Sequence, residues 1–307
     1  MIDLTPLIFA LAFILIALVS GNNLSSCSGS IIGGRIMNKR NGILLTMAGY
    51  ILGFLIEGSF LKTTFAILLP VPSATMVLLV LSIMIAVFII AQYARLPLSL
   101  SVSLTSALFG VSLALNLITN WGFMAGIVLF WILAIVLSIT IVPFIVGFIH
   151  KTIQKRNIWS SLKNIRLLLI TLSFFASFTL GANTIGLIYS TMPSNLLSLV
   201  VVITAIIAGS VIFSAGQLNK IGNEIISLRY VNAISAQTVS VGLVEIATLL
   251  GMPLSNTQTF AMSVYGAGAG YKTKLIKTKI IKQILYSWVA LSLVCFIVAY
   301  GVSFLIL

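Results

Sequence analysis

Ten long apolar stretches, separated by short segments that hold almost all of the basic residues, constrain this chain more than any other feature. With 60% hydrophobic and 7% charged residues, the sequence lacks the charge that the surface of a soluble globule needs. Stretches of about 20 apolar residues are typical of membrane-spanning helices. We therefore predict an all-α polytopic membrane protein. The expected crossings are 3–33, 42–60, 72–92, 97–117, 122–148, 167–189, 196–216, 229–250, 254–271 and 283–305, with breaks in the first, fourth, sixth and ninth.

The basic residues fall on one side of this topology. If the N-terminus is outside, the inner segments hold 16 of the 17 basic residues, and only Lys62 lies outside. The positive-inside rule then predicts a multi-pass protein of the cell membrane with both termini outside and with cytosolic segments at 150–166 and 272–282. The net charge of +13 is explained in this way without a nucleic-acid partner.

The second half of the sequence repeats the first. Arg95–Ser103 contains Leu-Pro-Leu-Ser, and Gly251–Thr259, which begins 156 positions later, contains Met-Pro-Leu-Ser. The same offset relates Gly53 to Gly209. Five crossings in each half make the second copy enter the membrane in the opposite sense, which is the inverted repeat of many secondary transporters. The predicted repeats are 1–149 and 167–307, joined by a basic cytosolic linker at 150–166.

Two polar runs that contain Gly and Asn, Ser20–Ser30 and Leu180–Gly186, interrupt apolar segments. Unpaired polar groups are costly at membrane depth, so the runs predict broken or re-entrant helices that line a cavity. Pro97 and Pro253 suit the first turn of a helix, so the Ser and Thr residues after them are expected at helix N-termini, which favour anions. For any one serine, a bond to its own helix or a helix–helix contact is the alternative. The predicted substrate-binding residues are Asn22, Asn23, Ser25, Ser99, Ser101, Asn183, Thr184, Ser255, Asn256 and Thr257.

Acidic residues are few, and they indicate transport chemistry rather than catalysis. Glu245 lies within a predicted span, where a titratable carboxyl is a candidate coupling group. Glu57 lies near a span end, a turn and a half before Lys62, and its role is left open. The sequence shows no nucleophile, metal cluster or pair of carboxylates, so we expect neither an enzyme nor a cofactor.

In this order and spacing, the motifs resemble the inorganic phosphate transporter (PiT) family. Each half of those proteins carries a Gly-Ala-Asn-Asp signature and a later Leu-Pro-x-Ser-Thr-Thr stretch. Here the first motif resembles Gly21–Asn23 and Gly181–Thr184, and the second resembles Pro97–Ser101 and Pro253–Gln258. The resemblance implies a secondary permease that binds a small tetrahedral oxyanion at broken helices and works by alternating access. Phosphate is the first expected substrate and sulfate, as in the sulfate permease-like branch, is the alternative. A passive anion channel and a non-transporting oxyanion sensor are the alternatives of another class.

The departures from the family pattern concern the coupling ion. The signature aspartate, which takes part in cation binding in sodium-coupled members, is replaced by Asn23 and Thr184. The glutamate of the following helix is replaced by Tyr50 and Ile206. Because a hard cation prefers carboxylate oxygens, these changes argue against sodium symport and favour a proton, with Glu245 as the coupling residue. The direction of transport and the oligomeric state, including a homo-oligomer, are left open.

Overall fold

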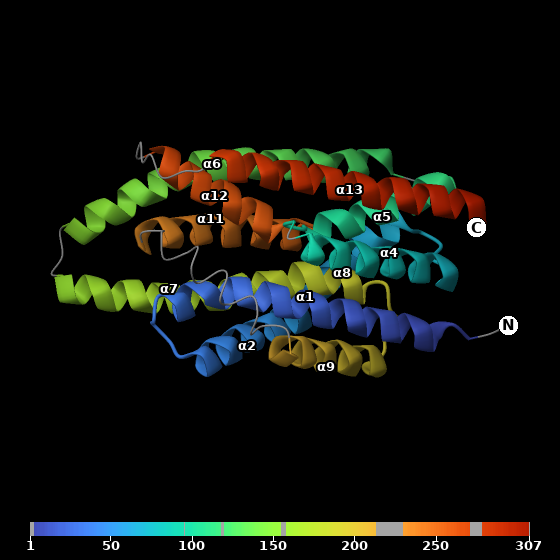
Figure 1. Cartoon of the computed structure of the whole chain (residues 1–307), viewed down its shortest axis with the longest axis horizontal. Helices are drawn as coiled ribbons and strands as arrows, with labels where there is room; N and C mark the ends of the chain where they lie inside the picture. Colours follow the sequence, from blue (N-terminus) through green and yellow to red (C-terminus); the bar gives the residue numbers. More distant parts are fainter. Residues whose placement is uncertain are drawn as a thin grey trace.

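Helices form nearly all of the molecule (Figure 1). The computed structural model describes residues 3–94, 96–117, 120–154, 158–212, 230–270 and 278–306, and within these ranges it contains no strand. Six helical segments of the described chain are long and apolar enough to cross a membrane: Thr5–Gly33, Lys39–Leu68, Ala74–Tyr93, Trp121–Thr152, Lys163–Tyr189 and Leu285–Leu305. These features confirm the all-α, multi-pass membrane class predicted from the sequence.

Each of the ten stretches predicted as crossings contains a helix. In chain order the elements are α1 (Thr5–Gly33), α2 (Lys39–Glu57), η1 (Gly58–Phe60), α3 (Leu61–Leu68), α4 (Ala74–Tyr93), α5 (Leu100–Ala114), α6 (Trp121–Gln154), α7 (Ile158–Leu180), η2 (Gly181–Ile185), α8 (Gly186–Tyr189), α9 (Leu196–Ile212), α11 (Tyr230–Leu249), α12 (Asn256–Gly270) and α13 (Thr278–Ile306). Both α5 and α12 have 15 residues and are about 22 Å long, which is shorter than the ~30 Å hydrocarbon core of a bilayer. Their N-termini therefore begin inside the molecule.

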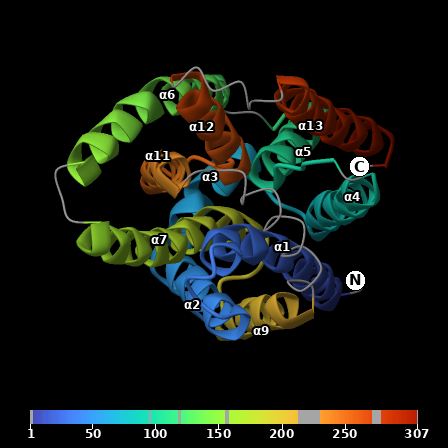
Figure 2. The ribbon, with the colours of Figure 1, turned by 60° about the vertical axis from the view of Figure 1, so that its left-hand side comes forward.

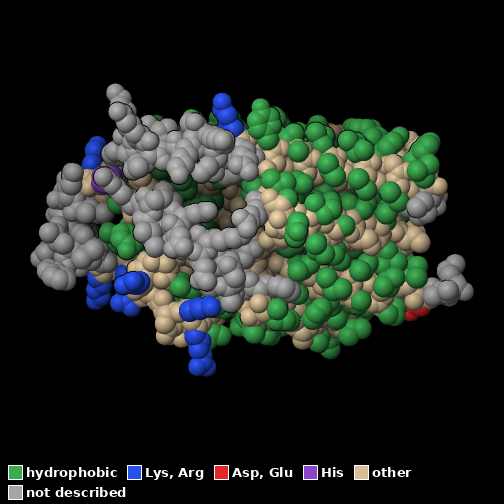
Figure 3. All heavy atoms as spheres, in the orientation of Figure 1, with side chains coloured by type: hydrophobic (Ala, Val, Ile, Leu, Met, Phe, Trp, Pro, Cys, Tyr) green, Lys and Arg blue, Asp and Glu red, His purple; other side chains and the backbone are tan. Residues whose placement is uncertain are grey.

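Local sequence explains where several helices begin. The side chain of Asn38 accepts a hydrogen bond from the Asn41 backbone N–H (2.9 Å) and caps α2. Ser73 caps α4 in the same way by accepting from the Met76 N–H (3.2 Å). The outer faces of the helices carry large exposed apolar side chains such as Phe144 (Figure 3). Such a surface is expected against lipid rather than water.

The helices form two bundles, and each bundle draws on both halves of the sequence. One contains α1, α2, α7 and α9 (Figure 2). The other consists of two smaller groups, α4 with α5 and α13, and α6 with α11 and α12, and these two groups together are called the second bundle below. Helix α11 packs against α6 and α12 and also contacts α7 of the first bundle. The units that pack together in space therefore differ from the two sequence repeats.

Equivalent helices of the two halves exchange partners. Helix α1 packs against α9 while α7 packs against α2, and α5 packs against α13 while α12 packs against α6. Glycines at the same sequence offset allow these close approaches: Gly53 lies against the backbone of Phe178, and Gly209 lies against that of Ala17. A Cβ at either glycine would collide with a carbonyl group. This reciprocal packing relates the two halves of the sequence, and their inverted topology stays a prediction.

Two local expectations are wrong. The first polar run, Ser20–Ser30, does not break its helix, because α1 is continuous through it. The hydroxyls of Ser25 and Ser28 donate back to the carbonyls four residues earlier (2.7 Å each), so the helix itself satisfies them. The linker at 150–166 is not a loop over its described part, since α6 extends to Gln154 and α7 begins at Ile158.

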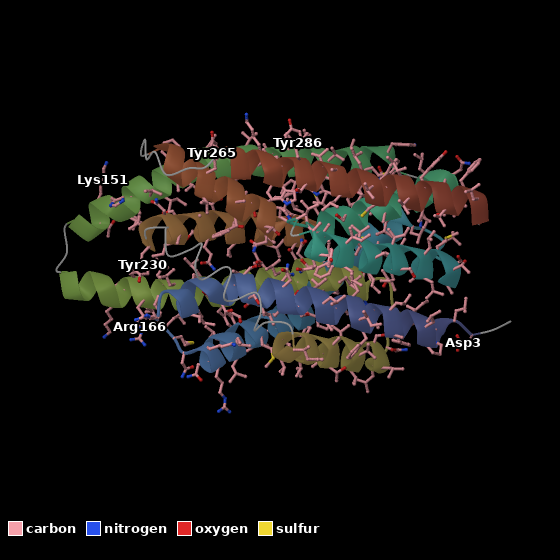
Figure 4. All side chains as sticks on the ribbon, in the orientation of Figure 1. Asp3, Lys151, Arg166, Tyr230, Tyr265 and Tyr286 are labelled. Atoms are coloured by element: carbon pink, nitrogen blue, oxygen red, sulfur yellow. The ribbon has the colours of Figure 1, made fainter. Side chains whose placement is uncertain are left out.

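Both chain ends lie at one end of the molecule, and described basic residues of the predicted cytosolic segments lie at the other. Figure 4 shows Asp3 at the first end, and Lys151 and Arg166 at the second. This separation agrees with the predicted topology. The predicted inner segments around Arg95, 213–229 and 271–277 lie outside the described residues.

Candidate functional site

A small cavity opens between the two bundles, where the predicted polar segments meet. The empty space, counting its opening to the outside, is about 310 Å³. Among the residues that the structure describes, the lining contains no charged side chain. The lining residues are Val19, Asn22, Asn23, Phe88, Leu98, Ser99, Leu100, Ser101, Leu180, Thr184, Ser255, Asn256 and Thr257. Eight of the ten residues predicted to bind substrate are among them, while Ser25 and Asn183 are not.

The N-terminus of α5 presents unsatisfied donors to this cavity. The first intrahelical bond runs from the Ser103 N–H to the Ser99 carbonyl (2.9 Å), so the N–H groups before it have no partner within the helix. The Ser99 side chain does not cap the helix. Its hydroxyl is buried, with the residue 2% exposed, and has no hydrogen-bond partner among the residues that the structure describes. This hydroxyl and the N–H groups beside it can donate to a ligand, and an anion matches the positive end of the helix dipole.

The N-terminus of α12, at the equivalent position of the second half, is arranged differently. The Ser255 hydroxyl accepts a hydrogen bond from the Gln258 N–H (3.2 Å) and so caps its own helix. The Asn256 Oδ1 accepts from the hydroxyl of Ser240 on α11 (2.6 Å), which leaves the amide N–H groups of Asn256 to donate elsewhere. The equivalent serines Ser99 and Ser255 thus have different roles.

Asn183, in the widened turn η2, joins the two bundles. Its Nδ2 donates to Thr248 Oγ1 and to the Met252 carbonyl, both at 3.0 Å. Its Oδ1 accepts from the Leu254 N–H (3.0 Å) and from the Ser101 hydroxyl (3.3 Å). Asn183 is fully buried, and its amide hydrogen bonds are used within the protein. This geometry makes Asn183 a clamp on the chain that leads into α12, rather than a group free to bind substrate.

The first half differs at the corresponding position. Asn22 lies 161 residues before Asn183 and lines the cavity, and no residue of the described chain hydrogen-bonds its side chain. The next residue, Asn23, donates through Nδ2 to the hydroxyl of Tyr50 (3.1 Å), which is fully buried. The two residues that replace family carboxylates in this half therefore form a neutral hydrogen-bonded pair.

The predicted coupling residue, Glu245, lies away from the cavity lining but has a partner that sequence reasoning did not assign. Its carboxyl lies close enough to that of Glu57, at the end of α2, for the two groups to interact electrostatically, so two negative charges there would repel each other. The Oε2 atom of each carboxyl is buried and has no partner within the described chain. Over the same residues, no group of three or more His, Cys, Asp or Glu side chains could hold a metal ion.

Sequence reasoning missed Ser240 and Thr248, which hold Asn256 and Asn183. Both lie on α11, and neither belongs to a motif, so no sequence signal distinguished them from other hydroxyls in apolar helices. The family resemblance identifies Tyr50 only as a replacement for a glutamate and does not predict its hydrogen bond with Asn23.

A helical membrane protein with a small polar cavity between two bundles has the design of a membrane transporter. Residues 159–299 match the model described as the phosphate transporter family. A protein of Methanocaldococcus jannaschii described as a phosphate permease is 23% identical over 293 residues, which are 95% of each chain. A protein of Bacillus subtilis described as a low-affinity inorganic phosphate transporter is 26% identical over 220 residues, 66% of this chain and 65% of that one. These matches confirm the predicted family resemblance.

A solved structure has the same fold. The protein, described as the sodium-dependent phosphate transporter, superposes with a TM-score of 0.81 at 18% identity and covers 100% of both chains. The resemblance to this family therefore extends to the fold of the whole chain.

Proposed function

We propose that this chain is a secondary permease for inorganic phosphate, which it binds as a small tetrahedral oxyanion in the cavity between the bundles. The observation that carries the proposal is the N-terminus of α5, where the buried Ser99 hydroxyl and the first backbone N–H groups face the cavity without partners. The names of the relatives in two organisms support phosphate as the ion. The proposed ligands are Asn22, Asn23, Ser99, Ser101, Thr184, Ser255, Asn256 and Thr257.

Neutral donors suit a transported anion. Two helix N-termini, at roughly half a positive charge each, offset about one negative charge. An arginine would add a full charge and strong bidentate bonds, which slow release. Binding by hydroxyls, amides and helix ends holds the anion and still allows it to leave.

The two bundles and the asymmetry between the sequence halves support a mechanism of alternating access. In this conformation Asn183 clamps the segment before α12, whereas no residue of the described chain hydrogen-bonds the side chain of the equivalent Asn22. One side of the cavity is thus held closed by hydrogen bonds that the other side lacks. In the opposite state, Asn22 forms the clamp and Asn183 releases it. In this proposal both termini lie on the outer side of the cell membrane. The inverted repeats are 1–149 and 167–307.

The coupling ion in this proposal is a proton carried by Glu245. The nearby carboxyl of Glu57 offers the proton a second acceptor. Glu245 lies one turn before Thr248 on α11, and Thr248 accepts a hydrogen bond from the Asn183 amide. Helix α11 therefore connects the carboxyls of Glu245 and Glu57 to the Asn183 clamp. A change of protonation at Glu245 can therefore bias the closed conformation. Sodium is not expected to couple, because Asn23 and Thr184 stand in place of carboxylates.

The test is uptake into proteoliposomes that contain the purified protein. Labelled phosphate and sulfate are each supplied with a sodium gradient, with a proton gradient and with neither. The proposal expects uptake of phosphate that responds to the proton gradient only, and stronger uptake of phosphate than of sulfate. Counterflow of labelled phosphate against unlabelled phosphate distinguishes a carrier from a channel. Absence of binding and uptake for both anions would contradict the proposed function.

A further inference from the structure

The side chain of Asn23 is held in one orientation at the cavity wall. Its Nδ2 donates to the hydroxyl of Tyr50, which is fully buried behind α1. No residue of the described chain donates a hydrogen bond to its Oδ1, although the amide lines the cavity. An amide that is held through its nitrogen offers its oxygen, which is only an acceptor.

Most of the other polar groups around the cavity can donate. The N–H groups at the start of α5 and the hydroxyl of Ser99 have no acceptor of their own. The oxygen of Asn256 is already occupied by Ser240, so its amide N–H groups remain. The hydroxyls can donate or accept, and the unbonded Asn22 side chain can turn, whereas Asn23 Oδ1 is an acceptor whose orientation is held by the hydrogen bond to Tyr50.

An oxyanion that fits this arrangement needs acceptor oxygens and one O–H group. Hydrogen phosphate and dihydrogen phosphate have both. Sulfate has four acceptor oxygens and no O–H group at neutral pH, so one of its oxygens would face the lone pairs of Asn23 Oδ1. A buried acceptor without a donor is costly, and a site built to accept from a substrate hydroxyl discriminates strongly against analogues that lack it.

We propose that Asn23, held in position by Tyr50, makes this transporter selective for protonated oxyanions by accepting a hydrogen bond from the substrate's O–H group. Asn23 is the specificity residue, and Tyr50 is a positioning residue that acts through it. This inference rests on the proposed function, and it names the chemical class of the substrate: hydrogen phosphate and arsenate, which carry an O–H group, but not sulfate.

Asn23 and Tyr50 are both uncharged, and this affects how an anion binds. A carboxylate at position 23 would also accept from the substrate, but its negative charge would repel the anion at contact distance. A neutral amide accepts the hydrogen bond without that repulsion. The replacement of the family aspartate by Asn23, paired with Tyr50 instead of a glutamate, thus has a consequence for the anion as well as for the cation.

The experiment measures competition by unlabelled anions for labelled phosphate in the purified full-length protein. The competitors are phosphate and arsenate, which carry an O–H group at neutral pH, and sulfate and monofluorophosphate, which do not. In the wild type, the first pair should bind about 10- to 100-fold more tightly than the second. The Tyr50→Phe variant releases the Asn23 amide, which can then turn its N–H groups toward the cavity. Its preference should fall toward unity, mainly because sulfate binds more tightly.

Two further variants keep the test decisive. Asn23→Leu removes the acceptor at similar volume, so phosphate should bind about 10-fold more weakly while sulfate binds no worse. Tyr189→Phe is the matched control, because Tyr189 is also buried but is not part of the cavity lining, and its selectivity should equal that of the wild type. Equal affinity for all four anions in the wild type, or an unchanged preference in both Tyr50→Phe and Asn23→Leu, would overturn the inference while leaving oxyanion transport intact. If no anion binds to the wild type, the proposed function itself fails.

Discussion

Replacing Asn183 by aspartate tests whether this residue is a clamp or a ligand. The amide donates two hydrogen bonds, to Thr248 Oγ1 and to the Met252 carbonyl, and an ionised carboxylate can donate neither. Each buried group that loses its partner costs about 1–3 kcal/mol, so Asn183→Asp should destabilise the protein by ~2–6 kcal/mol. That is a large fraction of the 5–15 kcal/mol that typically stabilises a folded domain. The melting temperature in detergent should therefore fall by several degrees.

The matched variant is Asn22→Asp, at the equivalent position of the first half. No residue of the described chain bonds the Asn22 side chain, so its replacement should leave the melting temperature nearly unchanged. A carboxylate there would repel the oxyanion, by ~4 kcal/mol at about 4 Å and an effective dielectric constant near 20, and binding of phosphate should be lost. The assay combines thermal unfolding and phosphate binding for both variants. If both variants kept the wild-type melting temperature and lost phosphate binding equally, Asn183 would be a ligand and the clamp would be wrong.

Three further predictions follow from the site and the packing. Ser99→Ala should weaken phosphate binding without loss of stability, because the Ser99 hydroxyl has no partner within the described chain. Ser255→Ala should instead lower the stability by about 0.5–2 kcal/mol, because it removes a helix cap. The reverse pattern in binding and melting assays would refute these roles. Glu245→Gln should flatten the pH dependence of phosphate uptake and leave exchange of bound anion intact, and uptake by the wild type that rises with a sodium gradient at fixed pH would contradict this coupling. In intact cells, an impermeant thiol reagent should label Val71→Cys but not Lys151→Cys. The native Cys27 and Cys295 are buried and should stay unlabelled. Labelling of Lys151→Cys from outside would show that the topology is reversed.

The fold class and the segments of the site could be predicted from the sequence because their signals are local or periodic. A run of about 20 apolar residues is itself the requirement for crossing a bilayer, so composition and spacing were sufficient to identify the membrane class. The offset between Gly53 and Gly209 was likewise visible in the sequence, and in the structure these glycines make equivalent close contacts with α7 and α1. The polar runs and the residues after Pro97 and Pro253 meet at one cavity, as expected for helix ends that carry unsatisfied donors.

Tertiary structure alone decided what each of these residues does. Asn22 and Asn183 are the same residue type in equivalent motifs, yet one faces the cavity and the other is saturated by hydrogen bonds to groups as far as 82 residues away in sequence. The pairing of Glu57 with Glu245 and of Asn23 with Tyr50 depends in the same way on helices that meet only after packing. A hydroxyl or an amide has few atoms that can form hydrogen bonds. Its role therefore depends on which groups the fold places within hydrogen-bond distance of it. The sequence by itself determined where polar groups enter the membrane, and the packing of the two bundles decided which of them remain free to bind an anion.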